Sequence, residues 1–294
     1  MLHIGAYPSY GAPTSALAVP VVEGLAASSR VRGLELPFLE GGVCLPAGAS
    51  LPGEWCHLVT MIPATMGESS DLYGLASPDA SGREAALGLL RSVREVVVRR
   101  GDVLAVEVQS APCRTGSASI FMDSLGEIAG WDWNGVELVV EHCDAWSEAH
   151  PVEKGFLSFA DELAAVASVQ GSATRVTAGV NWARSVIESR DVATGAAHVA
   201  QAARQGLLGA LMFSSVGDRE SALGGPWRDV HLAPVGIPGT PEGTLLTAEL
   251  IAETVAAAGP YDGILGLKIN LGPAAADPAT IVERLLQIAD LIPA

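Results

Sequence analysis

Positive charge is scarce in this chain, and lysine is the scarcest way of supplying it. Lys and Arg together number 17 against 33 Asp and Glu, which gives a formal net charge of −16 at pH 7. A surface of this sign repels nucleic-acid phosphates and anionic membranes, so neither is an expected partner. Only Lys154 and Lys268 are lysines. Because the chain otherwise uses arginine, a lysine inside a predicted buried strand indicates a function.

Other absences narrow the class of protein further. No apolar run approaches the roughly 18 residues of a membrane-spanning helix, and no basic leader opens the chain. The four cysteines (Cys44, Cys56, Cys113 and Cys143) lack zinc-ribbon or CxxC spacing. The sequence also lacks a Walker A loop, a GxGxxG after the first strand, a GxSxG elbow and an HExxH helix. We therefore expect a cytoplasmic protein with reduced thiols and no nucleotide-binding loop.

Apolar sequence, by contrast, makes up 49% of the 294 residues. Strand-like apolar runs alternate with Ala- and Leu-rich helix-like runs from end to end, which is typical of βα units around a parallel sheet. Eight strands are expected, at His3–Tyr7, Arg32–Phe38, Cys56–Ile62, Val103–Val108, Val136–Glu141, Val176–Val180, Leu208–Phe213 and Gly263–Ile269. Eight units at this length predict an α/β protein with one domain, 1–294, folded as a (β/α)8 TIM barrel. A doubly wound open sheet is the alternative.

Residue parity along the predicted strands indicates which side chains enter the barrel. Side chains alternate between the two faces of a strand, and small or polar residues here share one parity while bulky aliphatic residues share the other. Helices need bulky aliphatic residues to pack on, so we expect the small and polar set to face inward. Barrel active sites lie at the C-terminal ends of strands. There the inward set contains Glu35, Glu107, Gln109, Glu141, Asn181, Ser214, Lys268 and Asn270.

The stretch Val136–Trp146 concentrates ionisable groups where an apolar strand ends. Charged groups are costly to bury unpaired, so this cluster indicates a site, with a salt-bridged strand end as the alternative. Parity turns Glu141 into the barrel and His142 towards the helix layer, where it is either functional or a core histidine bonded to a loop. Asp144 lies past the strand end, where alternation no longer restricts it, and is able to reach the site.

Glu107 and Glu141 come from adjacent predicted strands, and we expect them at matching heights within several ångströms. Two close carboxylates raise one pKa and divide acid work from base work. Alternatively, a fixed cation such as Lys268 or Arg184 neutralises each of them. Lys268 has three candidate roles: fixing a carboxylate, stabilising an oxyanion, or forming a Schiff base. We favour electrostatic work, because nothing in the sequence marks a substrate carbonyl for imine formation.

The loop after the seventh predicted strand is about thirty residues long, a length typical of functional lids. It carries Asp229 and His231, which form an acid–base couple, a pair of metal ligands or a surface turn. Trp146, Trp182 and Trp227 follow strands five, six and seven. A tryptophan face suits the C–H groups of a sugar ring, although the same residues would also serve as plain core. Acids, amides and tryptophans together predict a small polyhydroxylated substrate.

Four stretches of the chain resemble a bacterial family known only as a domain of unknown function: Val140–Asp144, Gly179–Ser185, Leu211–Ser215 and Trp227–His231. The resemblance spans nearly the whole chain and places it near the xylose-isomerase-like TIM barrels. That wider group isomerises or epimerises sugars, usually with a divalent metal held by acids and histidines of strands five to eight.

Glu141 matches the strand-five glutamate of that group, whereas the other ligand positions differ. Asn181 stands on strand six, Ser214 on strand seven, and Lys268 where a strand-eight glutamate is expected. The resemblance therefore implies no metal quartet as such. An ammonium at Lys268 is able to replace the cation electrostatically. A divalent metal held by Glu141 with Asp144 or His231 remains an alternative.

We therefore expect an isomerase, epimerase or lyase that transfers a proton beside the carbonyl of a sugar or sugar acid. Glu141 and Glu107 are the expected base and acid, and Lys268 the oxyanion stabiliser. The expected substrate-binding residues are Gln109, Asp144, Trp146, Asn181, Trp182, Arg184, Ser214, Trp227, Asp229, His231 and Asn270. A glycoside hydrolase using Glu107 and Glu141, and a non-catalytic sugar-binding barrel, are the alternatives. Substrate identity and oligomeric state stay open.

Overall fold

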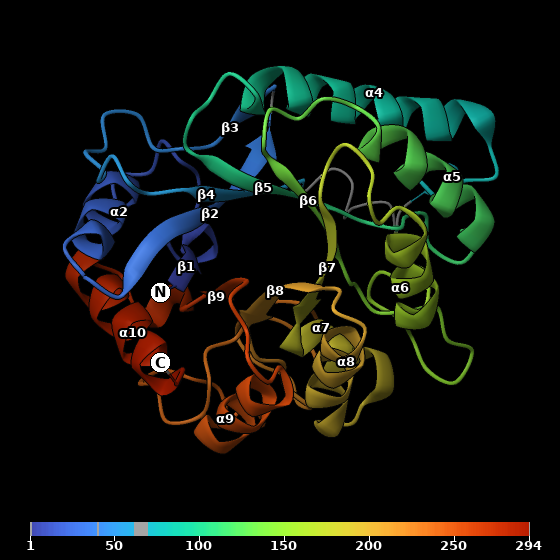
Figure 1. Cartoon of the computed structure of the whole chain (residues 1–294). Helices are drawn as coiled ribbons and strands as arrows, with labels where there is room; N and C mark the ends of the chain where they lie inside the picture. The colour runs from blue at the N-terminus through green and yellow to red at the C-terminus, as the bar shows by residue number, and fades with distance from the viewer. Residues whose placement is uncertain (1, 40, 62–69, 294) are drawn as a thin grey trace.

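The strands of this protein close into a parallel barrel surrounded by helices (Figure 1). The computed structural model describes residues 2–39, 41–61 and 70–293. The strands are β1 (Leu2–Gly5), β2 (Val31–Leu39), β3 (Gly42–Val43), β4 (His57–Thr60), β5 (Val103–Val108), β6 (Glu137–Glu141), β7 (Val176–Asn181), β8 (Leu208–Phe213) and β9 (Ile264–Lys268). β1 pairs with both β2 and β9, which closes the sheet, and β3 is an antiparallel extension of β2. The predicted TIM barrel is confirmed.

Helices follow most of the barrel strands. They are α1 (Tyr7–Tyr10), α2 (Ala18–Ala26), α4 (Ala80–Val97), α5 (Ala118–Ala129), α6 (Phe159–Ser168), α7 (Trp182–Ser189), α8 (Ala193–Arg204), α9 (Ala248–Ala257), the 3₁₀ turn η2 (Gly272–Ala274) and α10 (Pro278–Leu291). Oxygen-bearing side chains cap several N-termini by accepting a backbone N–H of the first turn, namely those of Asp79, Ser158, Thr247 and Asp277. Within the described ranges, no helix is both long and apolar enough to span a membrane.

Helix α7 was not expected from the sequence as an element of its own. It begins directly after β7, because Asn181 ends the strand and its side chain accepts the N–H of Ala183. This placement brings Arg184 into the first turn of a helix at the barrel mouth. The expected third strand runs to Ile62, which lies outside the described residues, so its end is untested.

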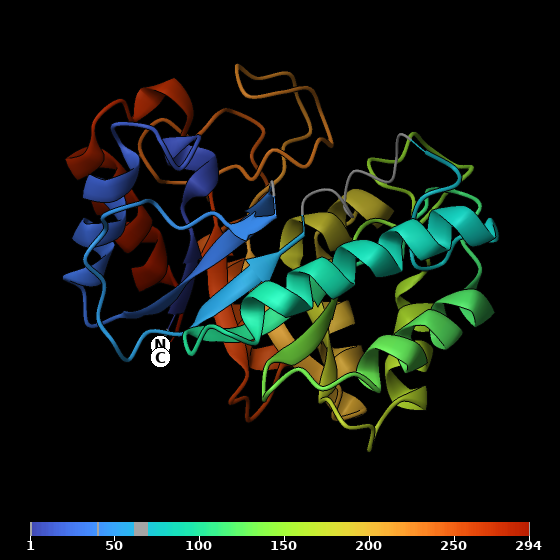
Figure 2. The ribbon, with the colours of Figure 1, turned by 90° about the horizontal axis from the view of Figure 1, so that it is seen from above.

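Burial inside the barrel follows the predicted parity. Val106 and Val108 pack in the main core, whereas Ala105, Val139 and Met212 belong to a separate apolar cluster with other inward-facing residues. The inward charged residues are at most 2% exposed: Glu35, Glu107, Glu141 and Lys268. The interior thus has an apolar layer and a charged layer. In Figure 2 the segment between β8 and α9, coloured orange, lies at the end of the barrel to which the strands point.

Two helical glycines make a matched test of the packing between barrel and helices. A Cβ on Gly195 of α8 would lie 2.3 Å from Cδ1 of Trp182, whereas one on Gly126 of α5 would meet nothing within 4 Å. We expect Gly195→Ala to lower the free energy of unfolding by about 1–3 kcal/mol through overpacking. Gly126→Ala should raise it by about 0.5–1 kcal/mol, since alanine favours helix. Urea unfolding measures both, and equal effects would contradict this packing of Trp182.

Candidate functional site

The charged layer contains a buried ion pair between Lys268 of β9 and Glu35 of β2. Nζ of Lys268 lies 2.5 Å from Oε1 of Glu35 and 3.9 Å from Oε1 of Glu141. Gly5 of the intervening β1 is level with Lys268, and a Cβ there would lie 2.9 Å from Oε2 of Glu35. The missing side chain therefore leaves the space that the ion pair occupies. Burial favours the neutral amine, but the Glu35 carboxylate raises the pKa of Lys268 well above its usual value.

Tyr7 belongs to the same group, and sequence reasoning missed it. Nζ of Lys268 lies 5.6 Å from the centre of the Tyr7 ring. Burial raises the pKa of Tyr7, so its hydroxyl stays protonated. The available signal in the sequence was the phenol of Tyr7, two residues after β1, but a tyrosine at this position is equally compatible with the start of a helix.

Glu141, at the end of β6, is held by a cation and an amide. Nη1 of Arg184 lies 2.6 Å from Oε1 of Glu141, and Nε2 of Gln109 donates to Oε2 at 2.9 Å. Burial opposes the charge on Glu141, but Arg184 and Lys268 lower its pKa to about 2. The alternative in which a fixed cation neutralises the carboxylate therefore describes Glu141.

The expected matching heights of Glu107 and Glu141 are wrong. The register pairs Glu107 with Val139 and Val108 with Val140, so Glu141 lies two residues higher. Glu141 is instead level with Gln109, which is why the two side chains hydrogen-bond. Neighbouring strands of a closed barrel are staggered. The strand ends predicted from the sequence therefore do not show how high Glu107 and Glu141 lie in the barrel relative to each other.

Glu107 differs from Glu141 because no cation neutralises it. Among the described residues, Glu107 has no ion pair, and its Oε2 has no hydrogen-bond partner. Burial raises the pKa of Glu107 well above the usual range, and the negative charges of Glu141 and Glu35 raise it further. The two glutamates thus differ: nearby cations favour the anionic form of Glu141, whereas burial favours the protonated form of Glu107.

Arg184 extends this network to the long loop after β8. Its Nε donates to Oδ2 of Asp229 at 3.0 Å, and Nζ of Lys154 lies 3.7 Å from the same oxygen. Burial opposes the charge on Asp229, but His231, Arg184 and Lys154 lower its pKa below the usual range. Both lysines of the chain therefore belong to one largely buried network that joins this loop to the barrel.

His231 contacts Asp229 but is not aligned with it as an acid–base couple. Its Nδ1 lies 3.2 Å from Oδ1 of Asp229, and neither atom has a hydrogen-bond partner among the described residues. Burial lowers the pKa of His231 to about 3, so the ring is neutral.

Two amide side chains of the predicted set bear unused polar atoms. Oδ1 of Asn181 accepts from the N–H of Ala183 at 3.1 Å and from Oγ of Ser214 at 2.9 Å. In the described part of the chain, Nδ2 of Asn181 and Oε1 of Gln109 are buried without a hydrogen-bond partner. Buried polar atoms are nearly always paired, so this unpaired donor and this unpaired acceptor are candidate contacts for a polar ligand.

The three tryptophans do not form a common wall. Trp182 is fully buried in the core between barrel and helices, so the alternative role as plain core describes it. Trp146 is 41% exposed, with Arg114 5.4 Å from its ring centre. Trp227 lies beneath Arg190, whose guanidinium is 4.7 Å from the ring centre. The last two lie on loops that follow β6 and β8.

Asp144 and Asn270 support local turns. The Asp144 carboxylate accepts the backbone N–H groups of Glu153, Lys154 and Gly155, at 2.7 Å from the first. Oδ1 of Asn270 accepts the N–H of Gly272 at 3.0 Å. Asp144 thus shapes the loop that carries Lys154, and its oxygens are directed to backbone amides.

Within the described ranges, Glu141 and Asp144 of the barrel interior are both engaged by other groups. Arg184 and Lys268 contact Glu141 where a metal ion would have to bind, and Asp144 is engaged with backbone amides. Elsewhere in the described residues, one group does have ligand atoms close enough to hold a metal ion: His142, Glu188 and His198, with all three atoms within 4.8 Å of one another.

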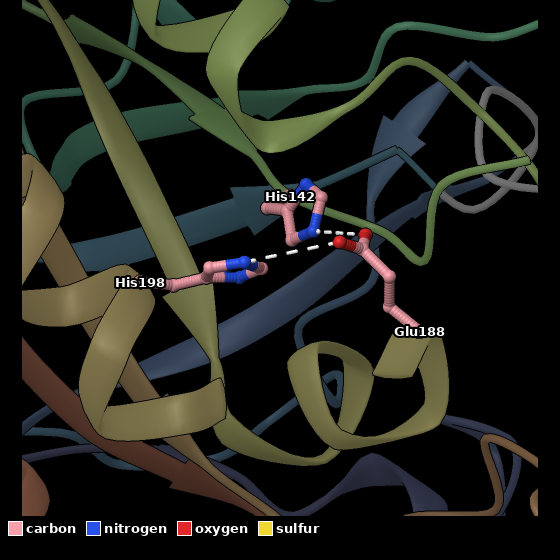
Figure 3. Close-up of side chains that lie close together, drawn as sticks. All are labelled: His142, Glu188 and His198. Carbon is pink, nitrogen blue, oxygen red and sulfur yellow. Dashed lines mark hydrogen bonds and ion pairs between the residues drawn. The ribbon is translucent and has the colours of Figure 1, made fainter. Parts of the chain in front are cut away.

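His142 faces the helix layer, as its parity predicts. Its Nδ1 lies 2.6 Å from Oε2 of Glu162 in α6, and its Nε2 lies 2.9 Å from Oε2 of Glu188 in α7. Figure 3 shows both histidines directed at the Glu188 carboxylate. Without a metal, burial opposes the charge on His142, but Glu162 and Glu188 raise its pKa to about 10.

Removing the central cation tests the charge network. We expect Arg184→Met to lower the free energy of unfolding by about 3–5 kcal/mol, because it removes the nearest cation from the buried carboxylates of Glu141 and Asp229. Arg91→Met, which removes exposed ion pairs with Glu84 and Glu127 and a contact over the Trp131 ring, should lower it much less. Denaturant unfolding at pH 7 measures both.

A pH series sharpens the same test. Glu141 contributes stability above its unfolded pKa of 4.5, and this contribution is lost as pH falls towards its folded pKa of about 2. The Arg184→Met variant has no such contribution to lose, so its deficit should shrink below pH 4.5. A deficit that is constant between pH 7 and pH 3 would contradict the pairing.

Comparison with known protein structures places the fold. The IolI protein with a bound zinc atom superposes with a TM-score of 0.66 at 9% identity, over 99% of this chain and 98% of its own. A "Putative Xylose isomerase" of Rhodospirillum rubrum gives 0.61 at 13% identity, over 99% and 97%. A xylose isomerase domain protein of Alicyclobacillus acidocaldarius gives 0.51 at 14% identity, over 99% and 98%. Such identities show the fold alone, a xylose-isomerase-like TIM barrel.

Sequence comparison assigns the family. The uncharacterized protein STM3670 of Salmonella typhimurium is 37% identical over 262 residues, which cover 82% of this chain and 80% of that protein. The family model described as Domain of unknown function (DUF4862) matches residues 3–284. The match covers nearly the whole chain and agrees with the resemblance seen in the sequence. The chain therefore belongs to the DUF4862 family.

Proposed function

We propose that this protein is an enzyme that moves a proton beside the carbonyl of a small sugar or sugar acid, as an isomerase, epimerase or lyase does. The observation that carries the proposal is the uncompensated carboxyl group of Glu107 inside a charged barrel. Likeness in fold to proteins named as xylose isomerases supports a sugar-like substrate. The reaction class rests on the charges of the site.

The charge count explains why Glu107 is the reactive carboxyl. Three buried carboxyl groups of the barrel strands, Glu35, Glu107 and Glu141, face two cations, Arg184 and Lys268. Glu35 and Glu141 each lie within 4 Å of a cation, whereas Glu107 has no ion pair among the described residues, so its protonated form is favoured. A carboxyl with a raised pKa is suited to proton transfer near neutral pH.

The geometry revises the expected roles of the two glutamates. Glu141, with a pKa of about 2, is too weak a base to take a proton from carbon. Glu107 in its ionised form is a stronger base, because the burial that raises its pKa also raises its affinity for a proton. We assign proton removal and return to Glu107. Glu141 then fixes Arg184 and Gln109 in position.

The buried cations stabilise the negative charge that develops on the substrate during the reaction. When Glu107 takes a proton from the carbon next to a carbonyl, the bonding electrons move onto the carbonyl oxygen. The Lys268 ammonium, buried and held by Glu35, stabilises that developing charge without reorganising. Return of the proton to the former carbonyl carbon, as the proton of the adjacent hydroxyl passes to the enediolate oxygen, gives an isomer. An epimer forms when a second proton donor returns a proton to the opposite face of the original carbon. The free atoms of Asn181 and Gln109 bind substrate hydroxyls.

The decisive test is deuterium uptake from D₂O into a panel of aldoses, ketoses and sugar acids, followed by NMR. The wild type should place solvent deuterium on a sugar carbon. Glu107→Gln should lower the rate by about 10²–10⁴-fold, the range for a lost acid–base group. Glu95→Gln, an exposed change on α4, is the matched control and should leave the rate unchanged.

The role of Lys268 needs a variant that keeps the charges balanced. Lys268→Met alone strands the Glu35 carboxylate, so we pair it with Glu35→Gln. The double variant should fold and lose about 10²–10³-fold in rate, because the oxyanion loses its cation. Sugar binding without any product in the wild type would support a non-catalytic barrel, and glycoside cleavage would support a hydrolase. Either result overturns the proposal.

The pH profile is a separate expectation. Because Glu107 acts in its ionised form, kcat/KM should rise as pH increases, with a midpoint well above the 4.5 of an ordinary glutamate. Glu107→Asp, which keeps a carboxyl group, should retain a rising profile, whereas Glu107→Gln should lose it. A profile that is flat between pH 4 and pH 9 in the wild type contradicts the assignment.

A further inference from the structure

We propose that His142, Glu188 and His198 form a zinc site outside the barrel, between the end of β6 and helices α7 and α8. The site is separate from the charged interior, since His142 has the opposite parity to Glu141. It does not depend on the proposed reaction. The positions of the ligand atoms, the groups behind them and the charge of the cluster support the site.

The ligand atoms converge on one point (Figure 3). Nε2 of His142 lies 2.9 Å from Oε2 of Glu188, and Nε2 of His198 lies 3.8 Å from Oε1 of the same carboxylate. All three ligand atoms lie within 4.8 Å of one another. Two ligands about 2.0 Å from a tetrahedral zinc ion are roughly 3.3 Å apart. Small side-chain rotations therefore bring this group to zinc geometry.

The groups behind the histidines orient both rings for metal binding. Nδ1 of His142 donates to Oε2 of Glu162 at 2.6 Å, and Nδ1 of His198 lies 3.1 Å from Oγ of Ser185, within hydrogen-bond distance. These contacts hold each ring with Nε2 directed at Glu188, and a metal ion would replace the proton that Nε2 of His142 shares with that carboxylate. A carboxylate behind a ligating histidine is the recurrent support of zinc sites. Ser110 in turn fixes Glu162 through a hydrogen bond of 2.5 Å.

The charge of the cluster also favours a dication. Two carboxyl groups, Glu162 and Glu188, lie against the histidines, and a dication bound between the ligands would attract both. Glu188 keeps its bond from the N–H of Ala145 at 2.8 Å, because a carboxylate has lone pairs for both partners.

The donor set and its surroundings favour zinc over magnesium and calcium. Two imidazoles and one carboxylate suit zinc, whereas magnesium and calcium require oxygen ligands. The side chains of Glu188 and His198 are 21% and 12% exposed, which leaves a path for the ion and a water molecule as fourth ligand. A bound ion would tie α7 and α8 to the residue that follows Glu141, so its expected role is to hold the mouth of β6 in place.

The test is to dialyse the purified whole chain against a chelator, add zinc and remove the unbound excess. We expect one equivalent of bound zinc by elemental analysis and a higher midpoint of thermal unfolding than in the zinc-free protein. Cobalt should give the visible absorption of a tetrahedral site. His198→Gln, which leaves the His142 ion pairs intact, should weaken zinc binding at least 100-fold and abolish the thermal shift. Glu162→Gln should weaken it by about 10–100-fold.

His150→Gln, in the loop after β6, is the matched control and should bind zinc as the wild type does. Circular dichroism establishes that each variant is folded before its affinity is compared. The proposal is overturned if the wild type binds no zinc that is added after dialysis, or if His198→Gln binds zinc with unchanged affinity. Both results are independent of catalytic activity, so failure of the proposed sugar reaction leaves this test intact.

Discussion

The need to balance buried charge governs the interior of this barrel. Arg184 contacts Glu141 at 2.6 Å and Asp229 at 3.0 Å, so one guanidinium joins a barrel strand to the loop that follows β8. Removing Arg184, or either of the two carboxylates, would leave an ionic partner buried in a medium that stabilises ions poorly. The position of α7, which carries Arg184, therefore determines the protonation of Glu141 and the placement of Asp229.

This balance also separates two glutamates that look equivalent in the sequence. Glu107 and Glu141 both face inward, yet Glu141 lies within 4 Å of two cations, whereas Glu107 forms no ion pair with the described residues. Their chemistry follows from the distribution of cations and not from residue type. Gly5 contributes to the same distribution, because its missing side chain allows Lys268 and Glu35 to pair across β1.

The end of β6 separates two environments. Glu141 faces the charged interior, and the next residue, His142, faces Glu162 and Glu188 in the helix layer. Since side chains alternate along a strand, adjacent residues serve opposite faces of the barrel wall. Among the described residues, the ligand atoms that are close enough to hold a metal ion lie on the outer face, in His142, Glu188 and His198. In this barrel the cations of the interior are supplied by arginine and lysine.

The sequence by itself determined the barrel and the inward set of charged residues. Both follow from local patterns, because the βα repeat and the parity of each strand are properties of neighbouring residues. Only the tertiary structure decided how these side chains pair. Strand stagger set Glu141 level with Gln109, and an unexpected helix brought Arg184 to Glu141. Packing placed Trp182 in the core, and the grouping of His142 with Glu188 and His198 joins residues from three elements. Such contacts depend on the relative placement of distant segments, which a local pattern does not contain.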